Sequence, residues 1–475
     1  MTQTTAVNTC DLLIIGAGPA GLKAAQIASA AGLSVWLADE NPLPGGQLLR
    51  QVTQSPFANP QTLFGEEYGA RRSLAEVAFS PHVRYLARTA VWQVTPEKQV
   101  YLLEQGESPR QHVVQARFIL LATGAQERSF PLPGWTLPGT MTVGAAQLLM
   151  KSAGLLPPAD SILVGNGPLL LLFAAQVVRA GGRIQAVLDT TRPQDYLRAL
   201  PRLPKALRHT SRDLFKGITL LRELQRAKVP YYSGVTDIAI EGETQVTAVR
   251  FSHRGHPIQR VTSTVLSHIG VIPATQCANA LGCKLVWDDE QHHWQPEVDE
   301  RQESSQPGIY LAGDAGGIEG GEAAILSGQL AALSIVHAAG KLAEDDYQHQ
   351  STALRQQRAA LRSLRPFLAA LYPIPKQAQK PHDDVTICRC EQVSAGEIRQ
   401  AARAGCAGMN QLKAFTRCGM GPCQGRMCGH NAAAILADTQ QRQVSETGYA
   451  RARFPLKPVT LAQLAFSNDD SEAST

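Results

Sequence analysis

The sequence predicts an α/β protein with two dinucleotide-binding domains and a small helical, cysteine-rich domain toward the C-terminus. Three observations carry this prediction. A strand–turn–helix–strand unit covers Asp11 to Glu40, a second strand–turn–helix unit starts at Ser161, and six of the 9 cysteines lie between Cys388 and Cys428. The length of 475 residues also exceeds what one hydrophobic core usually organises, so several domains are expected.

The first unit has the features of an adenine dinucleotide site. Its strand is the apolar run 12–15, and the glycines that follow have the spacing G-x-G-x-x-G. The first glycine of such a turn permits the bend, the second lets the backbone approach a pyrophosphate, and the third lets the helix lie close to the strand. The free N–H groups at the helix start can bind the phosphates. The predicted binding residues here are Gly16, Gly18, Pro19, Ala20 and Gly21.

A second apolar strand, Val35 to Ala38, places a carboxylate where it can bind ribose hydroxyls. Asp39 is the first candidate for this role and Glu40 is the alternative. A glycine motif alone is weak evidence, but strand, helix, second strand and terminal acid together are specific for a dinucleotide site.

Three later stretches predict that the dinucleotide is FAD. A turn with Gly46 and Gln47 can run beside a flavin, and the apolar strand from Phe118 ends in Ala-Thr-Gly, where small residues allow close approach of a cofactor. A third strand ends in Gly-Asp, whose carboxylate can accept a hydrogen bond from a ribityl hydroxyl. The further predicted cofactor residues are Gly46, Gln47, Thr123, Gly124, Gly313 and Asp314. Residues 41–51 contain no cysteine, which disfavours a disulfide reductase.

The second unit is predicted to be a nucleotide-binding fold whose site is not used. Gly165 and Gly167 are in place, but Leu170 stands at the third glycine position, where a side chain crowds the pyrophosphate. Asp189, after the next strand, would repel a 2′-phosphate. We interpret His268 as a structural residue near the domain junction.

The cysteine-rich domain is predicted to bind a [2Fe–2S] cluster through four thiolates. Cys388 and Cys390 supply one pair, and two of the cysteines in TRCGMGPCQGRMCG supply the other. Cys423 combines with either Cys418 or Cys428 in a C-x4-C spacing, so spacing does not decide between them. We prefer Cys388, Cys390, Cys423 and Cys428, with Cys418 as the alternative ligand. Zinc bound by the same thiolates is the main rival.

The expected domain boundaries follow from these motifs. The first part of the FAD-binding domain covers 1–155, the second nucleotide-binding fold 156–275 and the closing part of the FAD-binding domain 276–340. A helical linker is expected over 341–381, the [2Fe–2S] domain over 382–435 and a tail over 436–475.

Composition argues against a nucleic-acid or membrane-spanning protein. The net charge is only +5, and the denser basic stretch from Arg192 to Arg226 is best explained as a solvated helical face. The longest apolar run, Leu169 to Ala175, is too short to cross a bilayer, and the first ten residues lack the pattern of a secretory signal. We therefore expect a cytoplasmic location, with the inner face of the membrane as a further option.

Several stretches together carry a family resemblance: GAGPAGL, PGGQ, LLATGA, VGNGPLLLL, LAGDAGGIEGGEAAILSGQLAAL and CRCEQVSAGEIR with LKAFTRCGMGPCQGRMCG. They resemble the FAD/[2Fe–2S] alpha subunits of heteromeric amino-acid and opine oxidoreductases. This family includes the A subunits of opine oxidases, the B subunits of hydrogen cyanide synthases, and the alpha subunits of dye-linked proline and hydroxyproline dehydrogenases. The resemblance covers nearly the whole chain and implies two Rossmann-type domains arranged as in glutathione reductase, followed by a BFD-like [2Fe–2S] domain.

The resemblance also implies a division of labour between subunits. A beta subunit resembling D-amino-acid dehydrogenase would oxidise the C–N bond of an amino acid or opine on its own flavin. This chain would accept the electrons through FAD and the cluster, and no catalytic residue for the substrate is expected in it. Further expectations are an FMN at the subunit interface, peripheral contact with a membrane electron acceptor and a small ferredoxin-like gamma subunit. In some relatives the first site holds another adenine nucleotide, so FAD remains an inference.

Two rival functions fit these motifs less well. A self-contained NAD(P)H-dependent FAD/[2Fe–2S] reductase needs a working second nucleotide site, and Leu170 argues against it. An iron–sulfur delivery or metal-chaperone protein would use the cysteine domain alone and leaves the nucleotide-binding framework unexplained.

Overall fold

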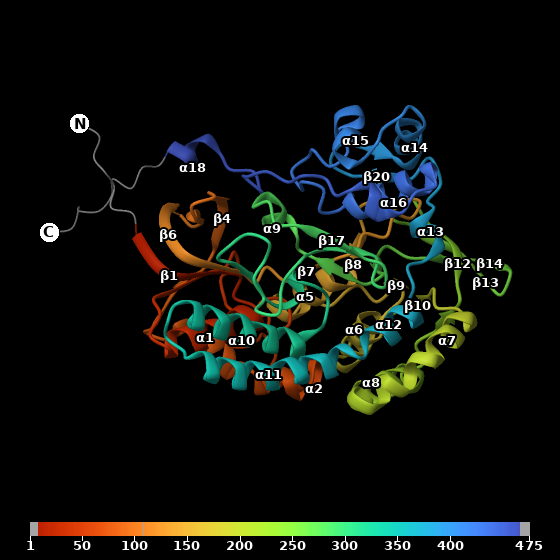
Figure 1. Ribbon diagram of the computed structural model, residues 1–475. Coiled ribbons are helices and arrows are strands. Elements are labelled where there is room, and N and C mark those ends of the chain that lie inside the picture. The colour runs from red at the N-terminus through yellow and green to blue at the C-terminus, as the bar shows by residue number, and fades with distance from the viewer. Residues whose placement is uncertain (1–7, 108, 466–475) are drawn as a thin grey trace.

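The computed structural model describes residues 8–107 and 109–465, and its largest sheet holds the first nucleotide-binding unit (Figure 1). The strand order is β3-β2-β1-β6-β5-β4, with β19 also pairing with β6. β1 runs parallel to β2 and to β6, as a buried βαβ sheet requires. The strands are β1 (Asn8–Ile15), β2 (Val35–Ala38), β3 (Val83–Leu86), β4 (Thr89–Val94), β5 (Gln99–Glu104), β6 (Arg110–Leu121) and β19 (Ile309–Leu311).

Strand β6 differs from the sequence-based expectation. The sequence predicted an apolar strand from Phe118, whereas the structure has a single 12-residue strand that already begins at Arg110. Its first half pairs antiparallel with β5, and its second half pairs in parallel with β19. Arg117 causes no break because it points outward at an exposed position while the extended backbone continues through it.

Two long helices pack together on one face of this sheet. They are α1 (Pro19–Ala30) and α10 (Gly321–Ala338), shown side by side in Figure 1. An added Cβ on Gly328 would lie 2.2 Å from the carbonyl oxygen of Ala20, so the helices can approach this closely only because residue 328 is glycine. The shorter elements α2 (Pro60–Phe64), α3 (Glu66–Ala70), α4 (Arg72–Glu76) and η1 (Val77–Phe79) connect β2 with β3.

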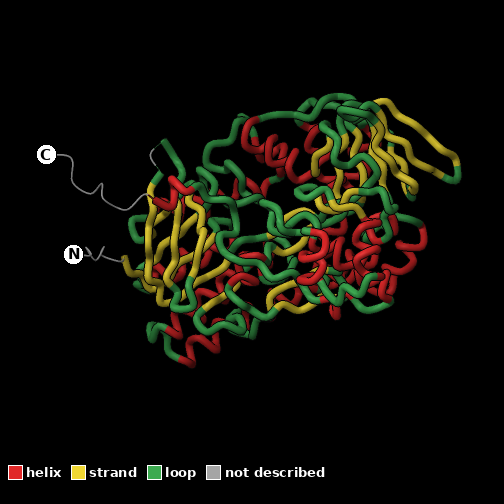
Figure 2. Tube along the Cα trace, turned by 90° about the horizontal axis from the view of Figure 1, so that it is seen from above, coloured by secondary structure: helices red, strands yellow, loops and turns green. Residues whose placement is uncertain are grey.

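The second nucleotide-binding unit forms an all-parallel sheet of order β11-β10-β9-β15-β8. Figure 2 shows two groups of strands toward opposite ends of the molecule. The strands are β8 (Thr140–Thr142), β9 (Ile162–Gly165), β10 (Ala186–Asp189), β11 (Tyr231–Ser233) and β15 (Val265–His268). The helices are α5 (Val143–Ala153), α6 (Pro168–Arg179), α7 (Pro193–Ala199) and α8 (Leu203–Arg226), with η2 (Leu200–Arg202) between the last two.

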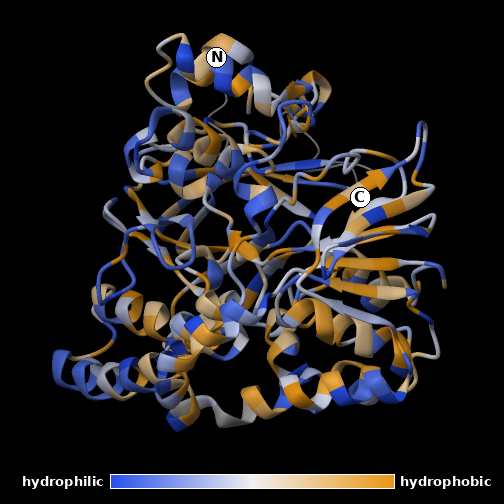
Figure 3. Ribbon diagram, turned by 90° about the vertical axis from the view of Figure 1, so that its right-hand side faces the viewer, coloured by the Kyte–Doolittle hydropathy of each residue, from blue (hydrophilic) through white to orange (hydrophobic). Residues whose placement is uncertain are grey.

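The basic stretch predicted to be helical forms α7 and α8. Leu220 and Leu224 of α8 are buried in the same core as α6, while Phe215 and Ile218 of α8 are exposed. In Figure 3 the helices along the lower edge carry hydrophilic and hydrophobic residues side by side. These helices are therefore amphipathic rather than polar on all sides.

Smaller sheets join the two units and close the first one. β7 (Ala125–Glu127) pairs with β16 (Val271–Pro273) where the chain passes between the units. β12 (Thr236–Glu241), β13 (Ala248–His253) and β14 (His256–Val261) form an antiparallel sheet. After α9 (Gln276–Ala280), the hairpin of β17 (Leu285–Asp288) and β18 (His293–Pro296) leads to β19 and the turn η3 (Gly313–Ala315).

The linker and the cysteine-rich domain are mostly helical. α11 (Glu344–Arg362) lies in the segment expected to be a helical linker, and α12 (Arg365–Leu371) and α13 (Lys376–Gln379) follow it. α14 begins with a capping box, in which Ser394 and Glu397 exchange side-chain and backbone hydrogen bonds. The domain holds β20 (Thr386–Cys388), β21 (Val393–Ser394), α14 (Ala395–Arg403), α15 (Met409–Thr416), α16 (Gly429–Gln440) and α17 (Val444–Thr447), and α18 (Leu461–Ala465) comes last.

The length and hydropathy of the helices bear on membrane insertion. Over residues 8–107 and 109–465, no helix combines the length and apolar character needed to cross a bilayer.

Candidate functional site

A cavity of about 230 Å³ opens at the carboxyl ends of β1 and β2, where a dinucleotide-binding sheet binds its ligand. One wall consists of the strand ends and the turn after β2, and a second wall comes from β4 and the Ala-Thr-Gly segment. The remaining walls come from α9 and from two C-terminal segments that no sequence motif connected with this site. The lining residues are Ile15, Gly16, Ala38–Asn41, Thr89, Val91, Thr123, Ala274, Gln276, Cys277, Arg426, Leu456 and Lys457.

The glycine turn beside the cavity tolerates no side chains at two positions. Gly16 has φ of +109°, and an added Cβ would lie 2.4 Å from the carbonyl oxygen of Ala122. An added Cβ on Gly21 would lie 2.0 Å from the carbonyl oxygen of Gly16, so the helix lies directly against the turn. Gly18 is the N-cap of α1. A Cβ added to Gly18 would have the Cα atom of Gly46 as its one neighbour, at 4.0 Å. The backbone around Gly18 is thus accessible to a phosphate.

Asp39 is buried and holds the glycine turn in place. Its Oδ2 accepts a hydrogen bond of 2.7 Å from the backbone N–H of Ala17. Its Oδ1 accepts from the backbone N–H and the side-chain amide of Asn41, at 2.8 and 2.7 Å. Glu40 also lines the cavity and forms an ion pair with Lys457. The strand-end carboxylates and the glycine turn therefore suit the adenosine and phosphate groups of an adenine nucleotide.

Of the residues predicted to bind the flavin half, Thr123 lines this cavity and the others do not. The amide of Gln47 donates a 2.7 Å hydrogen bond to the carbonyl of Ala125. Asp314 Oδ1 accepts from the backbone N–H groups of Glu319 and Gly320, so it shapes the loop before α10. The structure therefore brings together Gly16, Asp39, Glu40 and Thr123 around one cavity. Gly46, Gln47, Gly124, Gly313 and Asp314 do not line it, although Gly46 lies against Gly18 and Gly313 against Ala20.

Sequence analysis missed Lys151, which supports the turn carrying Gln47. Its ammonium group is buried and donates hydrogen bonds to the carbonyls of Gln47 and Leu48, at 3.2 and 3.1 Å. Desolvation by burial, and secondarily the nearby Arg50, lower the pKa of Lys151 from 10.5 to about 8. A lysine in the last turn of a helix has no sequence signal that distinguishes it from a surface residue, so this role was not predictable.

The lowered pKa of Lys151 predicts a rise in stability above pH 8. Between about pH 8 and 10.5 the unfolded chain keeps a proton on this lysine that the folded chain has lost, so the free energy of unfolding rises with pH by roughly 3 kcal/mol at most. In Lys151→Met this contribution should be absent, and thermal midpoints measured from pH 7 to 10.5 should rise less steeply than in the wild type. The exposed Lys205→Met is the control. Equal slopes in wild type and Lys151→Met would contradict the assignment.

A cysteine also lines the nucleotide cavity. Burial is the main cause that raises the pKa of Cys277 to about 12, so the thiol is protonated at neutral pH. A protonated, buried thiol is a poor nucleophile, and Cys277 serves as a small apolar wall residue.

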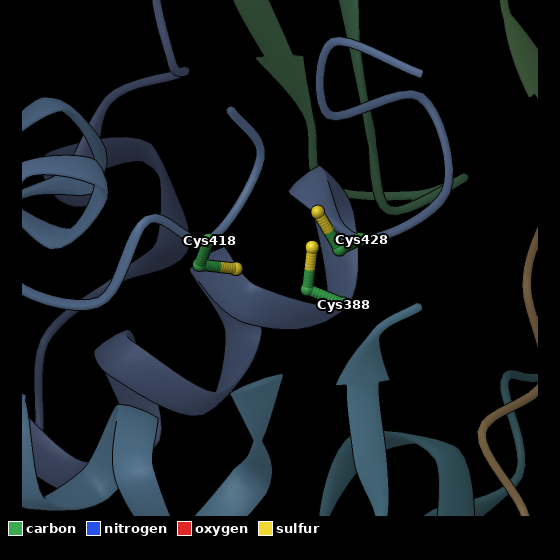
Figure 4. Close-up of side chains that lie close together, drawn as sticks. All are labelled: Cys388, Cys418 and Cys428. Atoms are coloured by element: carbon green, nitrogen blue, oxygen red, sulfur yellow. The ribbon is translucent and has the colours of Figure 1, made fainter. Parts of the chain in front are cut away.

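The candidate metal centre lies in the cysteine-rich domain. Cys388 at the end of β20, Cys418 after α15 and Cys428 before α16 are all buried, and their sulfur atoms lie within 4.8 Å of one another. Figure 4 shows the three side chains converging from these separate segments. Hydrogen bonds from Cys418 and then Cys428 lower the pKa of Cys388 to about 2. Three converging thiols, one of them readily ionised, suit a soft metal ion or an iron–sulfur cluster.

The other two cysteines of the predicted ligand sets lie beside each other. Cys390 is exposed and Cys423 is half-buried. The pKa of Cys390 is raised, mainly by partial desolvation of its thiol and secondarily through its interactions with Cys423. The three-cysteine group therefore contains Cys418, the alternative ligand, and not Cys423, the preferred one. The backbone explains the inward position of Cys418, because Arg417 ends α15 with a left-handed φ of +62° and turns the chain back toward β20.

The second glycine turn is occupied by the chain itself. The side-chain amide of Asn166 donates to the carbonyl of Pro373 in the linker at 2.8 Å, and Asp189 accepts hydrogen bonds from Tyr231 and Thr191. His268 is buried and binds Glu127 through Nδ1 at 2.7 Å, with its ring 3.6 Å from an ideal Cβ on Gly167. These contacts place the linker and His268 against the second glycine turn.

Comparisons with known proteins agree with this architecture. Residues 10–328 match the model of the pyridine nucleotide-disulphide oxidoreductase family, and residues 386–467 match the sarcosine oxidase A3 domain. The A subunit of opine oxidase from Rhizobium meliloti is 41% identical, over 96% of this chain and 98% of that protein.

The chain belongs to the pyridine nucleotide-disulphide oxidoreductase family, and within it to the group that contains the A subunits of opine oxidases. Hydrogen cyanide synthase subunit HcnB of Pseudomonas aeruginosa is 34% identical, over 97% of this chain and 99% of that protein. The L-proline dehydrogenase of P. horikoshii has the same fold, with a TM-score of 0.69 and 20% identity over 98% of this chain and 82% of that one. The family resemblance and the fold class predicted from the sequence are thus confirmed.

Membership of this family identifies the framework but not the chemistry. Residues 41–51, which follow the strand after the first glycine turn, contain no cysteine. The matching relatives that cover nearly the whole chain carry names of oxidase and synthase subunits. Among oxidoreductases of this fold, the chain therefore groups with subunits of larger enzymes.

Proposed function

We propose that this chain is the electron-transferring alpha subunit of a heteromeric amino-acid or opine dehydrogenase or oxidase, acting on CH–NH or CH–NH2 donors. The cofactors are FAD in the first nucleotide site and a [2Fe–2S] cluster in the cysteine-rich domain. When bound, these groups supply one- and two-electron transfer. The chain's own residues bind and orient them: the glycine turn and Asp39 on one side, and Cys388, Cys428 and their neighbours on the other.

One observation carries the proposal furthest: the nucleotide cavity and the thiol group share a segment of chain. Arg426 lines the cavity, and Cys428 belongs to the three-cysteine group only two residues further on. Electron transfer between two centres requires that they lie close together, and this arrangement provides it. A separate metal-chaperone role for the cysteine domain does not account for this docking.

The partners of this chain are part of the same proposal. A beta subunit resembling D-amino-acid dehydrogenase would carry the site for an amino acid or opine. Further components would be an FMN at the interface and a gamma subunit of ferredoxin type. The names of the opine oxidase and hydrogen cyanide synthase relatives support a role within a larger enzyme.

The location of the complex is part of the same proposal. We place it in the cytoplasm, with peripheral association with a membrane electron acceptor as an extension. The exposed Leu197 and Phe215 on the basic helices α7 and α8 support that extension.

The decisive experiment is spectroscopy on the anaerobically purified chain before and after reduction with dithionite. Flavin absorption bands together with an EPR signal typical of a reduced [2Fe–2S] cluster are expected. Another adenine nucleotide in place of flavin would restrict the chain's redox role to the cluster. Zinc in place of iron would make the cysteine domain structural and would overturn the proposed electron route.

The rival function, a self-contained NAD(P)H-dependent reductase, predicts fast reduction by NADH. Because Pro373 and His268 lie against the second glycine turn and Leu170 replaces its third glycine, we expect NADH to reduce the oxidised chain no faster than a buffer control does. Stopped-flow absorption under anaerobic conditions measures this. Full reduction of the cofactors by NADH within the first turnover would favour the rival.

A further inference from the structure

Arg426 stands out among the residues of the nucleotide cavity because it comes from the cysteine-rich domain. It is half-buried, and its Nη1 donates hydrogen bonds of 3.2 Å to the carbonyls of Cys423 and Leu456. Its own carbonyl accepts a 2.8 Å hydrogen bond from the side chain of Gln126 on β7. Both the backbone and one edge of the guanidinium are therefore fixed, which leaves Nε and Nη2 for another partner.

The charge of Arg426 is not balanced by the protein. Within residues 8–107 and 109–465, no carboxylate lies within ion-pair distance of its guanidinium. The acidic residues that line the same cavity are already engaged: Asp39 binds backbone N–H groups, and Glu40 pairs with Lys457. A partly buried cation in a polar cavity favours an anion, and a planar guanidinium suits phosphate oxygens.

The segment after the cysteine-rich domain closes the cavity on the same side. Residues 449–460, here called the closing segment, run from that domain back across the first unit toward α18 (Figure 1). Its Ala450 carbonyl accepts from the side chain of Asn279, and Leu456 is buried against the core beneath the first sheet. Leu456 and Lys457 then line the cavity. The nucleotide site is thus built by both ends of the chain.

We propose that Arg426 is a phosphate-binding residue of the nucleotide site, and that the site takes an adenine nucleotide with at least a diphosphate between the glycine turn and the cysteine-rich loop. The proposal rests on the proposed nucleotide site, although not on its role in electron transfer. FAD, ADP and ATP share this chemistry. Because Arg426 also hydrogen-bonds the carbonyl of Cys423, nucleotide binding is coupled to the surroundings of the thiols.

The test combines one substitution with ligands that differ in phosphate. The full-length chain, freed of bound nucleotide, is titrated calorimetrically with adenosine, ADP and FAD. We expect Arg426→Gln to weaken ADP binding roughly 10- to 100-fold, the usual loss for a charge-assisted hydrogen bond, and to leave adenosine binding unchanged. Arg426→Lys should recover part of the loss. A parallel loss with FAD and ADP shows that both use the site, whereas binding of only one of them identifies the ligand.

The matched control is Arg403→Gln, an exposed arginine on α14 of the same domain, which should bind ADP like the wild type. Iron content and thermal midpoint show whether each variant is folded. Equal ADP affinity in Arg426→Gln and wild type, or an equal loss for adenosine and ADP, overturns the proposal.

A second measurement tests the coupling between nucleotide binding and the thiols, and it requires a redox-active metal centre. In the wild type, saturating ADP should shift the reduction potential of the centre, and in Arg426→Gln this shift should disappear. If the chain binds ADP through Arg426 but contains no redox-active metal, the phosphate proposal stands while the proposed electron-transfer function fails. The two failures are therefore distinguishable.

Discussion

Replacing Cys388 with serine is expected to abolish metal binding almost completely. Cys388 belongs to every ligand set that the sequence allows, and in the structure it is the thiol that accepts hydrogen bonds from both Cys418 and Cys428. The substitution removes one thiolate from a four-thiolate site, and the serine hydroxyl is a poor ligand for a soft metal. Iron and acid-labile sulfide per chain should fall to background, and the visible absorption of the cluster should disappear.

The control for this prediction is Cys406→Ser. Cys406 is also buried in the same domain, but its thiol donates to the carbonyl of Gly408 and lies outside the three-cysteine group. Its substitution should leave the iron content unchanged and lower the thermal midpoint only slightly. Full iron content in Cys388→Ser would mean that the centre is not where the three thiols converge.

The same assay decides between Cys418 and Cys423. The structure places Cys418 with Cys388 and Cys428, whereas the ligand set preferred from the sequence was Cys388, Cys390, Cys423 and Cys428. If the three-cysteine group is the core of the site, Cys418→Ser loses the cluster. Retention of the cluster in Cys418→Ser and its loss in Cys423→Ser would restore the ligand set preferred from the sequence.

Gly16→Ala is expected to destabilise the first nucleotide-binding unit severely. The backbone at Gly16 has φ of +109°, and an added Cβ would lie 2.4 Å from the carbonyl oxygen of Ala122, a backbone atom that cannot move aside alone. Conformational strain and the close contact together should cost about 3 kcal/mol or more. We expect a thermal midpoint several degrees lower and loss of bound nucleotide on gel filtration.

Gly32→Ala is the matched control. Gly32 lies in the same unit and also has a positive φ, of +77°, but no atom lies within 4 Å of its ideal Cβ. This substitution should therefore cost only the strain of the left-handed conformation, about 1 kcal/mol, and should leave nucleotide binding intact. Similar losses in the two variants would show that backbone strain, not contact with Ala122, makes glycine necessary at position 16.

Local patterns were enough to predict most of the regular structure. The apolar run before Gly16 and the strand from Val35 to Ala38 each involve residues near one another in the chain. Such features depend on backbone geometry and on hydrogen bonds between sequence neighbours, so a local pattern can predict them. Strand β6 shows the limit, because pairing with β5, β1 and β19, and not the apolar pattern from Phe118 alone, decided the length of that strand.

The sequence by itself determined the fold class, the family, the glycine turn with Asp39 and the set of cysteines from which ligands are drawn. Only the tertiary structure placed Cys418 rather than Cys423 beside Cys388. Only the tertiary structure brought Arg426 and Lys457 to the cavity that Asp39 and Glu40 line, although more than 380 residues separate the two pairs in the sequence. The physical reason is that motif spacing encodes local geometry, whereas the docking of one domain on another depends on packing between distant surfaces. That docking gives the nucleotide site its positive wall.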